Sequence, residues 1–396
     1  MRHRFTKVLL GAALFTLLAG TATVAARSQH AEASYKIGFI YPRTGALGAY
    51  GAEEIQGFKL GLQYATKGTG KVNGKTLDIT YVDDKGDAAT GVTTAKDLIG
   101  QGYKILMGTG SSGVAVQIAP LAAQNQVLYI SGPAAADAIT GINKYTFRAG
   151  RQTIQDVLDA KSFLGKSSGK KVVVFDQDSV FGHGNYAAVK AFFTGHNVTE
   201  ISVPLTATDF TPFAQQAKNA NADLLFVAWA GTTAGAMWRA LDQQGVLSST
   251  TVTTGLAERA TWGSYGDPST AAKIKFLSHY VSTAPKNRVN DWLVKELRKR
   301  SHVPDIFTPD GFVTAQMIAR AVSKADGDDV GKMISALEGY QFLAPKGIQR
   351  IRPQDHAMMQ PMFQVQLTFP SGGRAAAKVL KVVSPGNVAP PVKPFG

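Results

Sequence analysis

The sequence predicts an α/β protein made of two doubly wound parallel-sheet lobes. Short apolar segments alternate with helical segments of about 10–15 residues, which is typical of a parallel sheet covered by helices on both faces. The alternation begins again after residues 147–150 (FRAG), so the chain contains two such halves. The length of 396 residues agrees with this reading, because domains average about 150 residues.

The first half carries strand-like and helix-like segments in strict alternation. Its strands are predicted at residues 36–41 (KIGFIY), 77–82, 105–107 and 127–130. Helices are predicted at residues 50–64, 88–101 and 112–125. In the first of these helices, Ile55, Phe58 and Leu62 recur at the spacing of one helical face.

The second half repeats the pattern and is followed by a mixed C-terminal region. Strands are predicted at residues 171–175 (KVVVF), 199–203, 224–228 and 251–254, with helices at 184–194, 212–218 and 233–244. Further helices are predicted at 290–300 and 310–325, a late strand at 363–369, and a Pro-rich tail after Ser384. In open parallel sheets ligands bind beyond the carboxyl ends of the strands, so the site is expected in the turns that follow them.

Residues 1–33 have the pattern of a signal peptide. Arg2, Arg4 and Lys7 precede an apolar run at residues 8–20, and the segment closes on the A-x-A pattern at 31–33, with residues 24–26 (VAA) as an alternative cleavage site. The run is shorter than the roughly 20 residues that span a bilayer. We therefore expect an exported, soluble mature chain.

Charge and cysteine content exclude several classes of function. Losing the leader removes four basic residues and one acidic residue, which lowers the formal net charge from +14 to +11. Export and the scattered placement of the basic residues argue against a nucleic-acid partner. The absence of cysteine excludes disulfides, thiol nucleophiles, cysteine-ligated clusters and a lipid anchor on cysteine.

Two segments resemble cofactor-binding motifs, but each lacks a residue or the order of elements that such a site requires. Residues 108–113 (GTGSSG) match G-x-G-x-x-G between a strand and a helix, but the acidic residue expected about 20 positions later is missing. Residues 68–76 (GTGKVNGKT) end in the GKT of a P-loop. A P-loop leads from a strand into a helix, whereas this segment leads from a predicted helix into a predicted strand. No two of the seven histidines have a local metal-binding spacing, and G-x-S-x-G is absent. Asp176 and Asp178 are read as turn and capping residues, so no enzyme activity, cofactor or metal is expected.

Several segments resemble a known family in the same order along the chain. Residues 37–45 (IGFIYPRTG) followed by Tyr50-Gly51 resemble the start of periplasmic branched-chain amino-acid-binding proteins. Further matches are residues 108–120 (GTGSSGVAVQIAP), 129–136 (YISGPAAA), 147–148, 175–184 (FDQDSVFGHG), 208–210 and 223–229. The resemblance implies the type I periplasmic-binding fold and a solute receptor of an ABC importer, without catalysis or cofactor.

The resemblance also implies how the carboxylate and the amine of a ligand are held. Ser112, at the start of a helix, matches the family's carboxylate-binding serine, although a plain N-cap serine is the alternative. Ala134 and Ala136 match the next strand end, where alanine at 136 replaces the usual threonine or serine and leaves a backbone N–H. Glu258 lies one residue from the family's acidic partner for the ligand amine, which leaves an amino-acid ligand in doubt.

Four aromatic residues are candidates for the walls of the pocket. Tyr50 matches the aromatic residue at the cleft rim, and Phe181 stands where a tyrosine commonly lines the second lobe. Trp229 follows a predicted strand, and Phe307 is a weaker candidate. With so many aromatic candidates, an aromatic or aliphatic carboxylic acid is the alternative to a branched-chain or other hydrophobic amino acid.

The resemblance further implies domain boundaries and partners. Lobe 1 is expected to comprise residues 34–148 and 282–354, and lobe 2 residues 149–281 and 355–385, with 386–396 as a tail. Hinge crossings are expected near residues 148–151, 280–282 and 352–355. The expected partners are a small solute and a membrane permease, and the chain is expected to act as a periplasmic monomer. A ligand sensor and a secreted enzyme that uses the same cleft remain the competing hypotheses.

Overall fold

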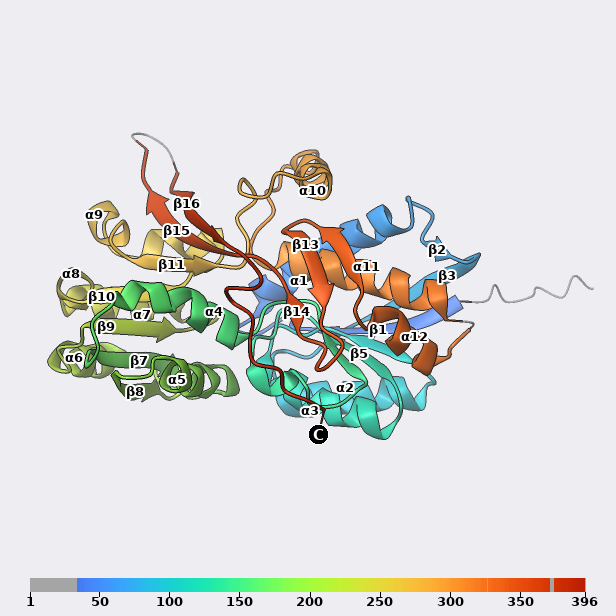
Figure 1. Ribbon diagram of the computed structural model, residues 1–396, viewed down its shortest axis with the longest axis horizontal. Coiled ribbons are helices and arrows are strands. Elements are labelled where there is room, and N and C mark those ends of the chain that lie inside the picture. Colours follow the sequence, from blue (N-terminus) through green and yellow to red (C-terminus); the bar gives the residue numbers. More distant parts are fainter. Residues whose placement is uncertain (1–33, 326, 371–373, 396) are drawn as a thin grey trace, which may run out of the picture. The chain divides into compact units, whose positions relative to one another are not determined.

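The first sheet lies in the N-terminal half of the chain and is almost wholly parallel. In the computed structural model (Figure 1), which describes residues 34–325, 327–370 and 374–395, the strand order of this sheet is β2-β3-β1-β4-β5-β6. The strands are β1 Ser34–Tyr41, β2 Lys71–Val72, β3 Lys75–Asp83, β4 Ile105–Met107, β5 Leu128–Ser131 and β6 Thr146–Arg148. Neighbouring strands run parallel except for the short β2–β3 pair.

Helices cover both faces of this sheet. On one face, α1 (Gly48–Ala65), α11 (Thr308–Lys324) and α12 (Val330–Leu337) pack against Phe39 of β1. On the other face, α2 (Ala88–Gly100) and α3 (Ser112–Gln124) pack against Ile40 of β1. Since successive residues of a strand point to opposite faces, the apolar run of β1 supplies both cores.

Smaller elements complete this lobe. Helix α10 (Arg288–Arg298) places Leu293 against Leu60 and Phe312. A small antiparallel sheet has the order β12-β13-β14, with β12 Gln341–Ala344, β13 Gly347–Ile351 and β14 Met358–Met359.

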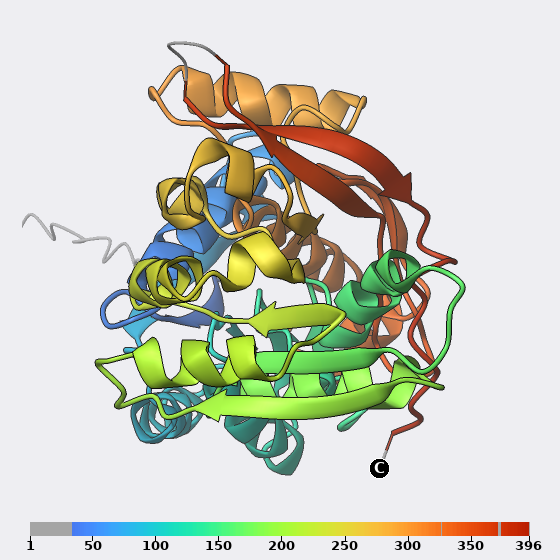
Figure 2. The ribbon, with the colours of Figure 1, turned by 90° about the vertical axis from the view of Figure 1, so that its left-hand side faces the viewer.

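The second sheet is parallel at its centre and antiparallel at one edge. Its order is β16-β15-β11-β10-β9-β7-β8. The parallel strands are β7 Lys171–Gln177, β8 Asn197–Val203, β9 Leu224–Ala228, β10 Thr251–Gly255 and β11 Lys275–Ser278. The antiparallel hairpin of β15 (Met362–Thr368) and β16 (Ala376–Val383) adds to β11 and forms the red edge in Figure 2.

Helices again lie on both faces of the second sheet. On one side, α4 (Thr153–Ala160) and α5 (Val180–Phe192) cover Val172 and Val174 of β7. On the other, α6 (Thr211–Asn219), α7 (Ala234–Gln243), α8 (Val246–Ser249) and α9 (Pro268–Ala271) surround the core that contains Val173 and Phe175. Short 3-10 helices lie at Asp137–Ile139, Lys161–Leu164 and Arg259–Ser264. The predicted class of two doubly wound α/β lobes is thus confirmed.

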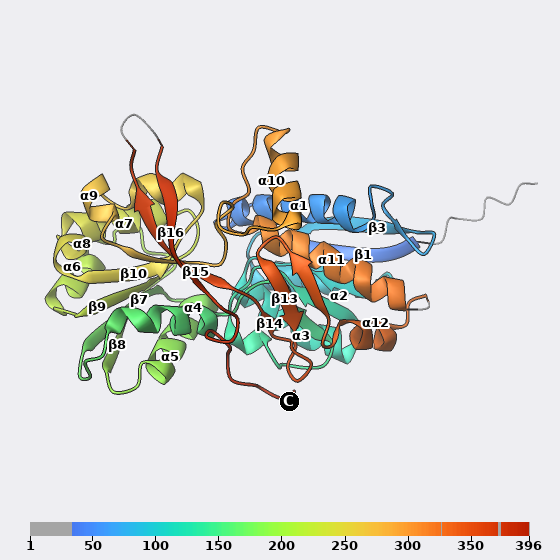
Figure 3. The ribbon, with the colours of Figure 1, turned by 45° about the horizontal axis from the view of Figure 1, so that its top comes forward.

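The chain passes between the two sheets at three points. Figure 3 labels α4, α10, β14 and β15, which border these points. These lie between β6 and α4, between β11 and α10, and between β14 and β15. The first two fall close to the expected crossings at 148–151 and 280–282. The third was expected at residues 352–355, but Met358 of β14 still packs into the core of the first lobe. We therefore propose that the third crossing follows Met359.

The C-terminal segment returns to the first lobe. Arg352 donates hydrogen bonds to the carbonyls of Pro390 and Pro391, and the Lys393 N–H donates to Asp355.

The leader predicted at residues 1–33 lies outside the described residues. Within the described part of the chain, no helix has the length and apolar character that crossing a bilayer requires.

Candidate functional site

A cavity of about 450 Å³ lies where the carboxyl ends of both sheets meet. The first lobe contributes residues 110–113, which span the end of the turn before α3 and the first residues of that helix, and the segment after β5. The second lobe contributes the ends of β7, β9 and β10, together with His279 after β11. This is the expected position, because parallel strands leave their ligand crevice at the carboxyl edge.

The lining includes five of the eight residues singled out from the sequence, namely Tyr50, Ser112, Phe181, Trp229 and Phe307. The neighbours Ala134 and Ala136 are buried, while Ala135 between them reaches the cavity. Glu258 is outside the lining as well. What each of the eight contributes to ligand binding stays a prediction.

The start of α3 presents hydrogen-bond donors to the cavity. Ser111 caps the helix, because its hydroxyl accepts the Val114 N–H at 3.4 Å. The first bond within the helix runs from the Ala115 N–H to the Ser111 carbonyl. The N–H groups of Ser112 and Gly113 precede that bond, so the helix itself leaves them for an external acceptor.

Arg148 holds the segment that faces this helix start. Its buried guanidinium donates to the carbonyls of Ala134 at 2.6 Å, Ala136 at 2.8 Å and Arg151 at 2.6 Å. Burial lowers the pKa of Arg148 to about 10, so the group stays charged at neutral pH. The Ala136 N–H, expected to face a ligand, donates instead to the Ser112 hydroxyl at 3.2 Å. Ser112 is therefore fixed in position while its own hydroxyl proton remains available.

Aromatic side chains from both lobes form apolar walls. Tyr50 and Phe307 have ring centroids 4.5 Å apart on the first-lobe side. On the second-lobe side, the rings of Trp229 and Phe175 stack with their centroids 5.8 Å apart. The Trp229 Nε1–H donates a hydrogen bond to the Thr233 hydroxyl at 3.0 Å. The indole is therefore held by packing and by one hydrogen bond, which leaves a defined face toward the cavity.

The basic and acidic groups of the lining are unequal in number. Lys85 and Arg151 are basic, and Asp156 accepts a hydrogen bond from Arg151 Nε at 3.0 Å. Burial, reinforced by Arg151 and Lys346, lowers the pKa of His279 well below its usual range, so this imidazole is neutral at pH 7. Among the described lining residues, the only carboxylate is thus already paired with a cation.

Glu258 belongs to a separate acidic group. Its Oε1 accepts the Thr261 hydroxyl proton at 2.6 Å, while Oε2 is buried without a hydrogen-bond partner among the described residues. Glu53 lies nearby and accepts the Phe307 N–H at 3.0 Å. The carboxylate matched to an amine-binding role therefore does not line the cavity.

The lining also includes polar residues that were not predicted from the sequence, among them Arg151, Asp156, Gln177 and His279. Gln177 ends β7 and His279 follows β11, so the strand-end rule points to both once these strands are known. Strand β11 was not predicted, and His279 was missed with it. Arg151 and Asp156 lie around the start of α4, which also had no sequence prediction.

Comparison with known proteins identifies the family. The periplasmic binding protein family matches residues 34–374. The "Leu/Ile/Val-binding protein homolog 3" of Brucella melitensis is 25% identical over 321 residues, covering 80% of this chain and 86% of that protein.

Solved structures agree with this assignment. An ABC-type branched-chain amino acid transporter protein of Rhodopseudomonas palustris is 31% identical, with a TM-score of 0.74, over 92% of this chain and 100% of that chain. A solute-binding protein of the same species, in complex with 3,4-dihydroxybenzoic acid, is 24% identical and shares the fold at a TM-score of 0.79, over 89% of this chain and 97% of that chain. The chain belongs to the periplasmic binding protein family and is a solute-binding protein of an ABC transporter.

Proposed function

We propose that this receptor binds a small monocarboxylic acid whose body is aromatic or branched aliphatic and which carries no ammonium group. The observation that carries the proposal is the charge of the lining. The described lining contains two basic residues, Lys85 and Arg151, and one carboxylate, Asp156, which is already paired with Arg151. An anion suits such a site, whereas a buried ammonium without a carboxylate partner would be costly.

The carboxylate is assigned to the start of α3. Ser112 would donate its hydroxyl proton, and the N–H groups of Ser112 and Gly113 would complete the anion site. Arg151 adds a positive charge, and its Nη2 makes no hydrogen bond to a described residue. The ligand body would then lie between Tyr50 and Trp229, against Phe181 and Phe307.

Names and titles of similar proteins support both ligand classes. Relatives are named for leucine, isoleucine and valine binding, and solved structures of the same fold are complexes with 4-hydroxybenzoate or benzoate. An apolar amino acid is therefore the second candidate. It would need Glu258, whose Oε2 has no hydrogen-bond partner among the described residues, to turn toward the cavity.

Matched ligand pairs separate the two candidates. Calorimetry would compare 4-methylpentanoate with leucine and 3-phenylpropanoate with phenylalanine, because the members of each pair differ only in the ammonium group. Benzoate and 4-hydroxybenzoate extend the series. We expect each acid to bind at least 10-fold more tightly than its amino counterpart. Equal or tighter binding of leucine would overturn the proposal and favour the amino-acid receptor.

We further propose that residues 1–33 are a cleavable leader, that the mature chain acts as a periplasmic monomer, and that it delivers its ligand to a membrane permease. Membership of a periplasmic binding protein family supports this placement. N-terminal sequencing of the exported chain and its mass by light scattering test the first two statements. A mature chain that still begins at Met1 would contradict the leader.

A further inference from the structure

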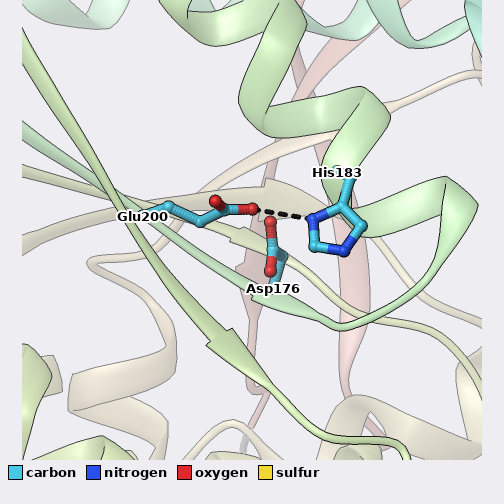
Figure 4. A group of neighbouring side chains, drawn as sticks. All are labelled: Asp176, His183 and Glu200. Carbon is cyan, nitrogen blue, oxygen red and sulfur yellow. Dashed lines mark hydrogen bonds and ion pairs between the residues drawn. The ribbon is translucent and has the colours of Figure 1, made fainter.

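A second polar cluster lies in the second lobe, on the face of the sheet that α5 covers. Asp176 is near the end of β7, Glu200 is on β8 and His183 is in the first turn of α5. In the parallel pairing of β7 with β8, Asp176 is opposite Ser202 and Val174 is opposite Glu200. Because side chains alternate along a strand, Asp176, Glu200 and Ser202 share the face toward α5. Figure 4 shows Asp176 and Glu200 beside His183 of that helix.

The three side chains converge closely enough to share one ion. One potential ligand atom of each lies within 4.8 Å of those of the other two. His183 Nδ1 and Glu200 Oε1 are 2.9 Å apart, as the dashed line in Figure 4 marks. Tetrahedral zinc with bonds of about 2.1 Å separates its ligands by about 3.4 Å, so shifts of an ångström or so would complete the geometry.

The second ring nitrogen of His183, Nε2, already has a carboxylate partner of the kind that orients metal-binding histidines. His183 Nε2 is 2.9 Å from Asp178 Oδ1. Metal-binding histidines usually donate their second N–H to a carboxylate, which fixes the ring and its tautomer. With the proton on Nε2, Nδ1 presents a lone pair toward Asp176 and Glu200.

An unsatisfied buried carboxylate provides the independent sign of a missing ligand. Asp176 is 0% exposed, and neither of its side-chain oxygens has a hydrogen-bond partner among the described residues. Its polar neighbours are Ser202 and Glu200, and the Ser202 hydroxyl is likewise buried without a partner. Buried carboxylates are normally paired or coordinated, so this group is expected to have a cationic partner.

We propose that Asp176, His183 and Glu200 bind a divalent transition-metal ion, Zn²⁺ foremost, with water in the remaining position. One imidazole and two carboxylates suit zinc, whereas Mg²⁺ and Ca²⁺ prefer all-oxygen sites. The ion can enter from solvent, since the His183 side chain is 51% and that of Glu200 24% exposed.

The site is separate from the ligand cavity but shares a helix with it. Phe181 of α5 lines the cavity, and His183 follows two residues later. A bound ion would tie the first turn of α5 to β7 and β8. It would therefore stabilise the second lobe independently of any carboxylic acid in the cavity.

The test is a zinc titration of tag-free, EDTA-treated protein that has been exchanged into metal-free buffer. Calorimetry with ZnCl₂ should give one ion per chain, and the melting temperature should rise by several degrees. Co²⁺ at the same site should give visible absorption bands of a low-coordinate ion. MgCl₂ and CaCl₂ should produce neither effect.

Variants locate the ion. His183→Gln and Glu200→Gln should each weaken Zn²⁺ binding at least 100-fold, and Asp178→Asn by about 10–100-fold, as for other outer-shell partners. His302→Ala, which removes an exposed histidine outside the cluster, is the control and should bind zinc normally. Circular dichroism and the melting temperature without metal establish that each variant is folded. Unchanged Zn²⁺ affinity in folded His183→Gln, or no stoichiometric binding by the original protein, would overturn the proposal.

Discussion

At the scale of single residues, Ser112 connects the backbone to the proposed carboxylate site. Its hydroxyl accepts the Ala136 N–H at 3.2 Å, which leaves its proton for the ligand. Ser112→Ala should weaken binding of a carboxylate ligand by about 1.5–3 kcal/mol, the usual value of a hydrogen bond to a charged group. This corresponds to about 10–150-fold in Kd, measured by calorimetry.

The neighbouring serine supplies a control for that variant. The Ser111 hydroxyl caps α3 and lies 3.3 Å from the Gly86 carbonyl, so it is committed to the fold. Ser111→Ala should lower stability by about 1 kcal/mol, the usual cost of a lost N-cap, with a smaller effect on Kd. Wild-type affinity in Ser112→Ala would remove this serine from the carboxylate site.

Asp176 gives the metal-free protein a pH dependence of definite sign. Burial raises its pKa from 3.8 to about 7. Between these values the folded state keeps a proton that the unfolded state has lost, so stability falls as pH rises from 4 to 7. In EDTA, Asp176→Asn should therefore gain thermal stability over the wild type by a few degrees at pH 7, and by less at pH 4.5.

The measurement is a series of melting curves for both proteins across that pH range. Asp87→Asn is the control, because hydrogen bonds from Thr90 lower the pKa of this exposed acid. An Asp176→Asn advantage that does not grow with pH would mean that this carboxylate is ionised in the fold without a metal.

The residues that sequence reasoning found or missed differ in a physical way. Trp229 follows a strand that the apolar pattern reveals, so the strand-end rule placed it next to the cavity, whereas Ser112 was found through the resemblance to a known family. The cluster of Asp176, His183 and Glu200 was not predicted, because its members come from three separate elements, β7, α5 and β8. Only the pairing of β7 with β8 brings Asp176 and Glu200 to one face.

At the scale of elements, strands with a continuous or alternating apolar pattern were predictable, whereas very short strands and strands with few apolar residues were not. Strands β1 and β7 are near-continuous apolar runs because helices cover them on both sides. Strand β14 has only two residues, and β11 has two apolar residues, Phe276 and Leu277, between a lysine and a serine, so neither gives a recognisable apolar pattern. Strand β16 alternates exposed and half-buried residues at the sheet edge, so its signal depends on the hairpin with β15.

At the scale of the whole molecule, a ligand can change the arrangement of the two lobes only through contacts that depend on that arrangement. The Gly231 N–H of the second lobe donates to the Tyr50 hydroxyl at 3.1 Å, and the Thr232 N–H donates to the Ala46 carbonyl at 3.2 Å. A ligand shifts a conformational equilibrium only by binding its states differently. Loss of these two hydrogen bonds should therefore lower the population of the arrangement of the lobes that binds the ligand, and so raise the apparent Kd.

Gly231→Ala tests this coupling without touching the proposed carboxylate site. Gly231 has a φ of +84°, and an added Cβ would lie 2.8 Å from the Ala46 carbonyl oxygen. This clash is present only when Gly231 meets Ala46 of the other lobe, and if it costs about 1–2 kcal/mol the apparent Kd should rise about 5–30-fold. Gly263→Ala, where an added Cβ meets nothing within 4 Å, is the control. Small-angle scattering should show that ligand reduces the radius of gyration in the control but, at equal ligand concentration, less in Gly231→Ala. Wild-type affinity and compaction in Gly231→Ala would separate ligand binding from this contact and place the coupling elsewhere in the cleft.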